Sequence, residues 1–110
     1  MAGNDGFKLL TEENFKNGVS AGLTLVDFYA DWCGPCRMLT PVLQEVAKDV
    51  AGHATIGKID IDQAQKTATA YQVTSIPTLI LFKDGKEVGR LVGLRDRETI
   101  KEFILAGAHK

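Results

Sequence analysis

The sequence predicts an α/β domain, with a central mixed sheet of five strands and about four flanking helices on both faces. Three observations predict this class. Apolar, β-branched runs of strand length alternate with segments whose apolar residues have a helical spacing. The last two strand runs follow each other through the turn residues 84–85, Asp-Gly, which is a hairpin signal. The order β-α-β-α-β-α-β-β-α implies parallel and antiparallel neighbours in one sheet.

The first half of the chain is expected to hold two strands and two helices. Residues 7–10 predict a short strand, and Thr11 is expected to cap a brief helix over residues 12–19. Residues 23–30 (LTLVDFYA) are almost continuously apolar, as in a central strand covered on both faces. A helix then opens at the CGPC segment and ends at Gly52. Its apolar face consists of Leu39, Val42, Leu43, Val46, Ala47 and Val50.

The second half predicts three strands and two helices. Residues 55–61 (TIGKIDI) alternate and are β-branched, which indicates a strand, and Asp62 is expected to cap a helix that runs through about Tyr71. Residues 78–82 and 87–92 are the two hairpin strands. Asp96 is expected to cap a last amphipathic helix. Its apolar face includes Ile100, Phe103, Ile104 and Ala108.

Length and composition favour a soluble single domain over residues 1–110, with residues 1–6 as a flexible N-terminus. The net charge of -1 argues against nucleic acid or an anionic membrane as the main partner. Residues 1–6 (MAGNDG) do not have the pattern of a secretory signal, and the sequence has no apolar run long enough for a membrane span. We therefore expect a cytoplasmic monomer.

The only two cysteines, Cys33 and Cys36, lie in the segment WCGPC. A structural disulfide is a poor explanation, because closing a four-residue loop stabilises a fold by only roughly 1.9 kcal/mol, against about 3 for a fifteen-residue loop. In a compartment that keeps thiols reduced, a CxxC pair is catalytic or metal-binding. The spacing therefore favours a redox-active dithiol.

Three other interpretations compete for this pair. A zinc site needs about four ligands, and beyond the two cysteines the chain offers only His53 and His109 at irregular spacing. Covalent haem attachment needs a histidine directly after the second cysteine, where this chain has Arg37. An inert buried pair is the remaining alternative.

The position of the pair predicts unequal roles for the two sulfurs. Cys33 lies where a buried strand meets a helix N-terminus, so unpaired backbone N–H groups, that of Cys36 among them, stabilise its thiolate. Pro35 suits the first helical turn. Cys33 is therefore expected to attack a target disulfide, and the more buried Cys36 to resolve the mixed disulfide.

Residues 26–36 (VDFYADWCGPC) resemble the active-site segment of the thioredoxin family almost throughout. Pro41, Lys58, Asp60, residues 75–78 (SIPT) and residues 92–93 also fall where the family places them, so the resemblance covers about residues 7–107. The departures are mild: Tyr29 replaces a tryptophan that many bacterial members have, and Leu94 follows Gly93 where a smaller residue is common.

The resemblance implies a thioredoxin fold and the reduction of disulfides in oxidised target proteins. It implies no bound cofactor, only the reversible Cys33–Cys36 disulfide. The reducing electrons would come from a thioredoxin reductase, so NADPH would act only indirectly through that partner. The Gly34-Pro35 dipeptide resembles the reducing branch of the family rather than the Gly-His pair of disulfide isomerases.

Two charged residues interrupt apolar strand runs. Asp27 is interpreted as a buried acid/base that takes the proton of Cys36, and the alternative is an aspartate at a strand end bound to backbone N–H groups. Lys58 could pair with Asp27 across adjacent strands, or it could face solvent on an alternating strand. The resemblance favours a tuning role for Lys58.

Ile76-Pro77 precedes a strand, and base rates alone favour a trans bond there. The resemblance implies a cis proline beside the dithiol, with neighbouring backbone that pairs with substrate in the manner of β-augmentation. An apolar substrate-contact patch around the sulfurs is expected, with scattered surface residues as the alternative. It would consist of Trp32, Gly34, Pro35, Ile76, Val92, Gly93 and Leu94.

Two rival functions stay open at this point. A thioredoxin-fold oxidant or isomerase differs from a reductant in its redox potential relative to glutathione. A binding module, such as a processivity subunit, would use the surface of the fold while the dithiol is incidental. Such a module would survive the substitution Cys33→Ser, whereas a redox protein would not.

Overall fold

A computed structural model describes residues 6–110, so of the N-terminal segment expected to be flexible only Gly6 belongs to the described part, and residues 1–5 lie outside it. Five strands form one sheet in the order β1-β3-β2-β4-β5, and the expected mixed five-stranded sheet with four helices is confirmed. The elements are β1 (Phe7–Leu10), α1 (Phe15–Val19), β2 (Leu23–Tyr29), α2 (Gly34–Asp49), β3 (Thr55–Asp60), α3 (Gln65–Ala70), β4 (Thr78–Lys83), β5 (Lys86–Val92) and α4 (Arg97–Gly107).

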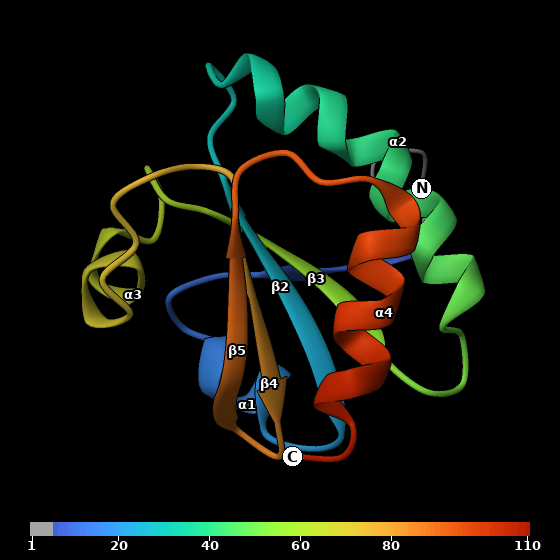
Figure 1. Cartoon of the computed structure of the whole chain (residues 1–110). Coiled ribbons are helices and arrows are strands. Elements are labelled where there is room, and N and C mark those ends of the chain that lie inside the picture. Colours follow the sequence, from blue (N-terminus) through green and yellow to red (C-terminus); the bar gives the residue numbers. More distant parts are fainter. Residues whose placement is uncertain (1–5) are drawn as a thin grey trace.

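The sheet combines parallel and antiparallel pairing as the element order requires. Strand β3 runs parallel to β1 and β2, and β4 runs antiparallel to β2 and β5. Helices α2 and α4 lie on one side of the sheet, and α1 and α3 on the other (Figure 1). Strand β2 therefore has strand neighbours on both edges and helices over both faces, which explains its nearly continuous apolar sequence.

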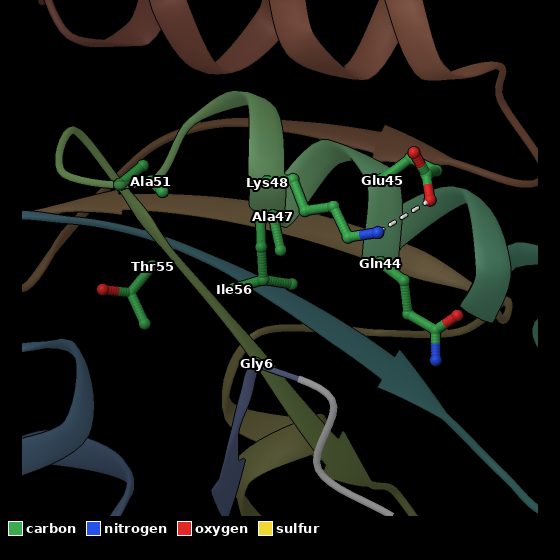
Figure 2. Close-up of a pocket in the computed structure, with 9 residues that line it drawn as sticks. Gly6, Gln44, Glu45, Ala47, Lys48, Ala51, Thr55 and Ile56 are labelled. Carbon is green, nitrogen blue, oxygen red and sulfur yellow. Dashed lines mark hydrogen bonds and ion pairs between the residues drawn. The ribbon is translucent and has the colours of Figure 1, made fainter.

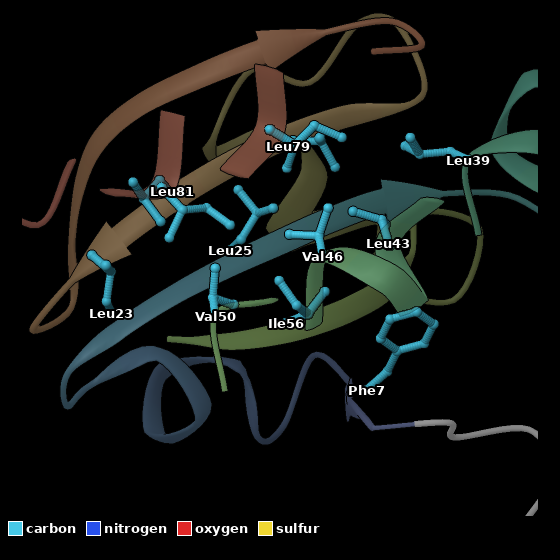
Figure 3. Packing of buried hydrophobic residues seen from close by; sticks show 12 residues of the cluster. Phe7, Leu23, Leu25, Leu39, Leu43, Val46, Val50, Ile56, Leu79 and Leu81 are labelled. Atoms are coloured by element: carbon cyan, nitrogen blue, oxygen red, sulfur yellow. The ribbon is translucent and has the colours of Figure 1, made fainter. Parts of the chain in front are cut away.

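Each face of the sheet has its own core. Between the sheet and helices α2 and α4, side chains such as Leu25, Leu43 and Ile56 interlock (Figure 3). A second cluster around Phe15 and Phe28 fills the opposite face, under α1 and α3. Burying one such side chain contributes about 1.5–3 kcal/mol, so the two clusters hold β2 and the N-terminus of α2 in fixed relation.

The first helix is shorter than predicted. Thr11 does not cap a helix over residues 12–19, because α1 begins only at Phe15. Instead the Thr11 hydroxyl accepts a hydrogen bond from the Asn14 N–H (3.1 Å), and the Asn14 side chain accepts one from the Thr11 N–H (2.7 Å). These reciprocal bonds close a separate turn before the helix begins.

The expected cap of α3 is also wrong. Asp62 lies outside this helix, which begins at Gln65 after Ala64, a residue with no capping side chain. The N–H groups of Lys66 and Thr67 instead donate to the carboxylate of Glu12, at 2.9 and 3.0 Å. The start of α3 is thus stabilised by Glu12, which lies more than fifty residues earlier in the chain. The sequence around α3 itself does not reveal this contact.

The other element ends agree with the sequence to within a few residues. Asp84 and Gly85 both have positive φ, 50° and 87°, as a two-residue hairpin turn requires, and Lys83 faces Lys86 across it. Asp96 caps α4 as predicted, with its carboxylate 2.9 Å from the Thr99 N–H. Helix α2 ends at Asp49 rather than at Gly52, and a turn follows it.

Candidate active site

The two sulfurs lie at the N-terminus of α2 and are bonded to each other. Cys33 is the N-cap residue, with extended backbone, and its Sγ accepts a hydrogen bond from the Cys36 N–H at 3.1 Å. Pro35 occupies the first turn, where a missing N–H leaves no donor unused. The expected backbone donor to Cys33 is therefore present.

Both cysteines are almost completely buried. Their exposed fractions are 5% for Cys33 and 3% for Cys36, so the expected difference in burial is small in the disulfide form. The pair packs with Ala30 and with the half-buried side chains of Tyr29, Ile61 and Ile76. The two sulfurs differ instead in their place on the helix, because Cys33 alone has the capping position.

Residues from the β4 and β5 ends lie beside Cys33. The Cys33 Sγ is 3.9 Å from the Ile76 carbonyl oxygen, an acceptor for the Cys33 thiol once the pair is reduced. The Ile76-Pro77 bond is cis, as the resemblance implied. The Gly93 N–H donates to the Pro77 carbonyl at 2.8 Å, and Val92 pairs with the residue after Pro77. Ile76 thus lies next to the dithiol, and Val92 and Gly93 pair with the residues that follow it.

The surface around these residues has exposed apolar side chains. Trp32, which directly precedes Cys33, is 67% exposed, and Val92 and Leu94 are exposed as well. The Trp32 indole N–H donates to the carboxylate of Asp62 at 2.8 Å, which fixes one edge of the ring. The large exposed indole next to Cys33 therefore has its N–H bound to a charged acceptor.

Asp27 is buried in the middle of β2, with an exposed fraction of 0%. Neither of its carboxyl oxygens has a hydrogen-bond partner among residues 6–110, so the alternative of an aspartate bound to backbone N–H groups is wrong. Burial raises the pKa of Asp27 to about 7, and the nearby positive charge of Lys58 opposes that rise. Asp27 is therefore an acid that can gain and lose a proton near neutral pH.

Lys58 is the direct strand partner of Asp27, but the two side chains form neither a hydrogen bond nor an ion pair among the described residues. The Lys58 ammonium donates instead to the Thr40 hydroxyl oxygen at 3.2 Å, and it lies 4.5 Å from the centre of the Tyr29 ring. It is half-buried rather than solvent-facing. The hydroxyl and the aromatic face compete with Asp27 for the same ammonium.

A small hollow of about 110 Å³ connects Lys58 with the dithiol. It is lined by Tyr29, Ala30, Asp31, Cys36, Arg37, Thr40 and Lys58. A space of this size is large enough for water. Asp27 does not line it, although its strand partner Lys58 does.

A larger hollow of about 580 Å³ lies elsewhere, between α2 and β3 (Figure 2). Its lining includes Gln44, Ala51 and Thr55, and the ion pair between Lys48 and Glu45 (3.4 Å) lies at its side. None of the expected site residues lines it. The reactive chemistry and the larger hollow are therefore separate features of the fold.

The described residues 6–110 contain no group of three or more His, Cys, Asp or Glu side chains arranged to hold a metal ion. His53 and His109 are both exposed and do not join the cysteines. In that same part of the chain, no helix has the length and apolar character needed to cross a membrane.

Sequence reasoning missed three residues at the site. Thr40 lies inside a helical pattern, where a threonine gives no signal of a contact with the neighbouring sheet. Asp62 has the local pattern of a helix cap, although it binds Trp32. Ile61, which packs against the cysteines, is expected as the last residue of a strand but follows β3 instead.

A buried CxxC disulfide at a helix N-terminus, beside a cis proline on a mixed sheet, defines a protein that exchanges dithiols and disulfides. Known proteins agree with this class. The family model described as thioredoxin matches residues 6–106, so the chain belongs to the thioredoxin family. Its activity is protein dithiol–disulfide exchange through the Cys33–Cys36 pair, without a bound cofactor.

Individual relatives are similar over nearly their whole length. Thioredoxin of Chlamydia pneumoniae is 57% identical over 97 residues, which are 88% of this chain and 94% of the relative. Thioredoxin of Staphylococcus saprophyticus is 48% identical over 95 residues, 86% of this chain and 91% of the relative. Among solved structures, a point mutant of thioredoxin from Halobacterium salinarum NRC-1 superposes with a TM-score of 0.85 at 39% identity, covering 94% of this chain and 92% of that one.

Proposed function

We propose that this chain is a general reductant of protein disulfides in which Cys33 is the nucleophile and Cys36 the resolving thiol. One observation carries this assignment of roles: Cys33 caps α2, and its sulfur accepts the Cys36 N–H. A hydrogen bond and a positive helix end stabilise a thiolate more than a thiol, and the thiolate is the attacking species. Cys36 lies within the helix turn and lacks that position.

The reaction proceeds in two exchanges. The Cys33 thiolate attacks one sulfur of a target disulfide, the target S–S bond breaks, and one target thiolate leaves and takes a proton. Cys36 then loses its proton and attacks the Cys33 sulfur, which releases the second target thiolate. The second target thiolate also takes a proton. The target gains two electrons from the Cys33–Cys36 pair, which becomes a disulfide, and two protons, one that Cys36 releases and one from solvent, where the Cys33 proton went when its thiolate formed.

Asp27 is proposed as the buried acid/base of the second exchange. A carboxyl group with a pKa of about 7 can take up the proton that Cys36 releases at neutral pH. Lys58, the strand partner of Asp27, lines the same small hollow as Cys36, so the two groups share a neighbour. Lys58 would tune this step, because its charge opposes the rise in the pKa of Asp27.

Targets are proposed to bind over the apolar surface and the cis-proline loop. The exposed Trp32 directly precedes Cys33, and the Ile76 carbonyl lies beside the Cys33 sulfur. Val92 and Gly93 pair with the backbone of residues 77–78, next to Ile76. Backbone pairing at the Ile76-Pro77 segment would orient an extended target segment without reading its side chains. Gly34 and Pro35 complete the contact surface on the α2 side. Recognition of this kind makes specificity broad.

Re-reduction of the disulfide is assigned to a thioredoxin reductase, which would draw on NADPH. The chain is further proposed to act as a cytoplasmic monomer whose described residues form one domain. The family match over residues 6–106 and the single five-stranded sheet support the one-domain proposal. The net charge of -1 supports proteins, rather than nucleic acid or membrane, as partners.

Reduction of insulin disulfides, driven by NADPH and a thioredoxin reductase, tests the proposal. Turnover should require both cysteines, so Cys33→Ser and Cys36→Ser should each abolish it. A redox potential well below that of glutathione should accompany turnover, whereas a higher potential would indicate an oxidant or isomerase. If the Cys33→Ser variant kept its full function by binding a partner without reducing it, a binding module would be favoured instead.

A further inference from the structure

The Lys58 ammonium has two candidate acceptors, the Asp27 carboxyl group and the Thr40 hydroxyl, and it donates to the hydroxyl. Asp27 lies opposite Lys58 in the neighbouring strand, fully buried and without a hydrogen-bond partner among the described residues. The Lys58 ammonium nevertheless donates to Thr40 Oγ1, 3.2 Å away on α2. A neutral hydroxyl is a weaker acceptor than a carboxylate, so the position of Lys58 requires that the hydroxyl be held in a suitable orientation.

Thr40 is held in that orientation by the helix that carries the dithiol. Its hydroxyl donates to the carbonyl oxygen of Cys36 at 3.3 Å, which leaves an oxygen lone pair free to accept from Lys58. A chain of two hydrogen bonds therefore runs from Lys58 through Thr40 to the backbone of Cys36. Such bonds from threonine to the carbonyl one turn back are local, so this one forms as soon as α2 does.

The Tyr29 ring provides the second contact of the ammonium, with the ring centre 4.5 Å from Nζ. Burial raises the pKa of Tyr29, and the negative charges of Asp60, Asp31 and Asp27 raise it further. The ring therefore stays neutral and offers its face to the cation. Arg37, the other cation that lines the hollow, donates to the Asp31 carbonyl oxygen at 2.7 Å. Lys58 is therefore the cation of this hollow that lies opposite Asp27 in the sheet.

We propose that Thr40 is a positioning residue that holds the Lys58 ammonium away from the Asp27 carboxyl group. Without the hydroxyl, the ammonium loses an acceptor, and the unpartnered carboxylate opposite it becomes its strongest neighbour. The four-carbon side chain of Lys58 can rotate to reach it. The closer positive charge would then favour the ionised form of Asp27 and lower its proton affinity. Thr40 thus keeps Asp27 protonatable in the neutral range.

The substitution Thr40→Val tests this directly, because valine matches the shape of threonine without the hydroxyl. The titration of Asp27 would be followed by carboxyl carbon NMR in the oxidised protein, in which no thiol titrates alongside it. The Asp27 midpoint should fall by about one pH unit or more in Thr40→Val, as expected when an opposite charge moves within contact distance. Thr40→Ser, which keeps the hydroxyl, should retain the wild-type midpoint.

A double-mutant cycle with Lys58→Met separates positioning from a general disturbance of α2. In the Lys58→Met background the ammonium is absent, so Thr40→Val should leave the Asp27 midpoint unchanged. An equal fall in both backgrounds would overturn the proposal. An unchanged or raised midpoint in Thr40→Val alone would overturn it as well.

The proposal rests on the proposed acid/base role of Asp27 only for its kinetic consequence. Suppose that Asp27 takes the proton of Cys36 when the mixed disulfide is resolved. The part of the pH–turnover profile that depends on Asp27 should then shift to lower pH in Thr40→Val, by the same amount as the NMR midpoint. If the NMR midpoint falls as expected but the pH–turnover profile does not move, the result supports positioning by Thr40 and counts against Asp27 as the acid/base of resolution. The two ideas therefore fail by different measurements.

Discussion

Asp27 and Lys58 face each other across β2 and β3 without forming an ion pair, because the Lys58 ammonium binds the Thr40 hydroxyl. A direct buried ion pair would fix Asp27 in its ionised form, and the loss of hydration would consume most of the energy gained. The observed arrangement leaves the acid with a pKa of about 7. The relation between these two residues therefore leaves a buried carboxyl group that can be protonated near neutral pH.

The two cysteines should react unequally once the disulfide is reduced. Cys33 should alkylate about tenfold faster than Cys36 at neutral pH, because the helix N-terminus and the Cys36 N–H stabilise its thiolate. Mass spectrometry of iodoacetamide-treated protein, quenched over time, measures both rates. Cys36→Ser should still attack a target but accumulate as a mixed disulfide, since the resolving thiol is gone.

Cys33→Ser is the matched control for that experiment, because it keeps the second thiol but should trap no target. The assignment of roles would be reversed if Cys36 alkylated faster, or if Cys33→Ser were the variant that accumulated mixed disulfide.

Glu12 should stabilise α3 from a distance. The hydrogen bond from the Thr67 hydroxyl lowers the pKa of Glu12, and the N–H groups of Lys66 and Thr67 add to this against the opposing effect of burial. A carboxyl group with a lowered folded-state pKa stabilises the fold above its unfolded pKa, and that contribution is lost as pH falls through the folded value. Glu12→Ala should therefore lower the unfolding midpoint at neutral pH, comparably with loss of a helix cap.

Thermal or denaturant unfolding at neutral pH and at about pH 3 measures this effect, and the difference between Glu12→Ala and wild type should shrink at the lower pH. Glu13→Ala, an exposed neighbour on the same turn, is the control. Equal effects of the two substitutions would show that Glu12 does not act as a cap.

The five strands and the mixed character of their sheet could be predicted, because each strand carries its signal within its own residues. The apolar run of β2, the alternation of β3 and the Asp84-Gly85 turn are local patterns, and the structure confirms them. The short helices could not be placed as well. The start of α3 is stabilised by Glu12, which lies outside its own segment, and no local pattern reports that contact.

At the site too, the sequence predicts the residues with a local signal but not those brought together by tertiary packing. The dithiol and its backbone donor follow from five consecutive residues, and Asp27 stands out because a carboxylate is unexpected in an apolar strand. The partner of Lys58 could not be found, because strand register places Asp27 opposite it while the three-dimensional packing of α2 supplies Thr40. Side-chain choices between two nearby acceptors depend on tertiary geometry that sequence patterns do not contain.

Asp62 should set the orientation of the exposed indole of Trp32. The chain has a single tryptophan, so its indole N–H gives one NMR signal and its fluorescence one source. Asp62→Ala removes the acceptor 2.8 Å from the indole nitrogen and should shift that signal, speed its hydrogen exchange and raise the KM for a protein target several-fold. Asp62→Asn keeps an acceptor oxygen, so its indole signal, exchange rate and KM should lie between those of the wild type and Asp62→Ala.

An unchanged indole signal in Asp62→Ala would mean that packing alone holds the ring. A changed signal with an unchanged KM would mean that Trp32 orientation does not contribute to target binding.

Asp27→Asn should make the protein more stable at neutral pH and less active. Burial raises the pKa of Asp27 from 3.8 to about 7, so between these values the native state binds more protons than the unfolded state. Stability therefore falls as pH rises through that window, and above pH 7 the full penalty applies, about 4 kcal/mol at about 1.4 kcal/mol per pH unit. Replacing the carboxyl with an amide removes this penalty, so the gain should be largest above pH 7 and shrink towards zero below about pH 4.

The same substitution should slow resolution of the mixed disulfide, because Cys36 loses its proton acceptor. Denaturant unfolding across pH, with insulin-reduction turnover measured on the same samples, gives both quantities. Glu102→Gln, which changes an exposed carboxyl group on α4 that does not line the hollow, is the control. Stability and activity moving in opposite directions is the behaviour of a residue kept for function. A variant less stable at pH 7 with unchanged turnover would instead make Asp27 a structural residue.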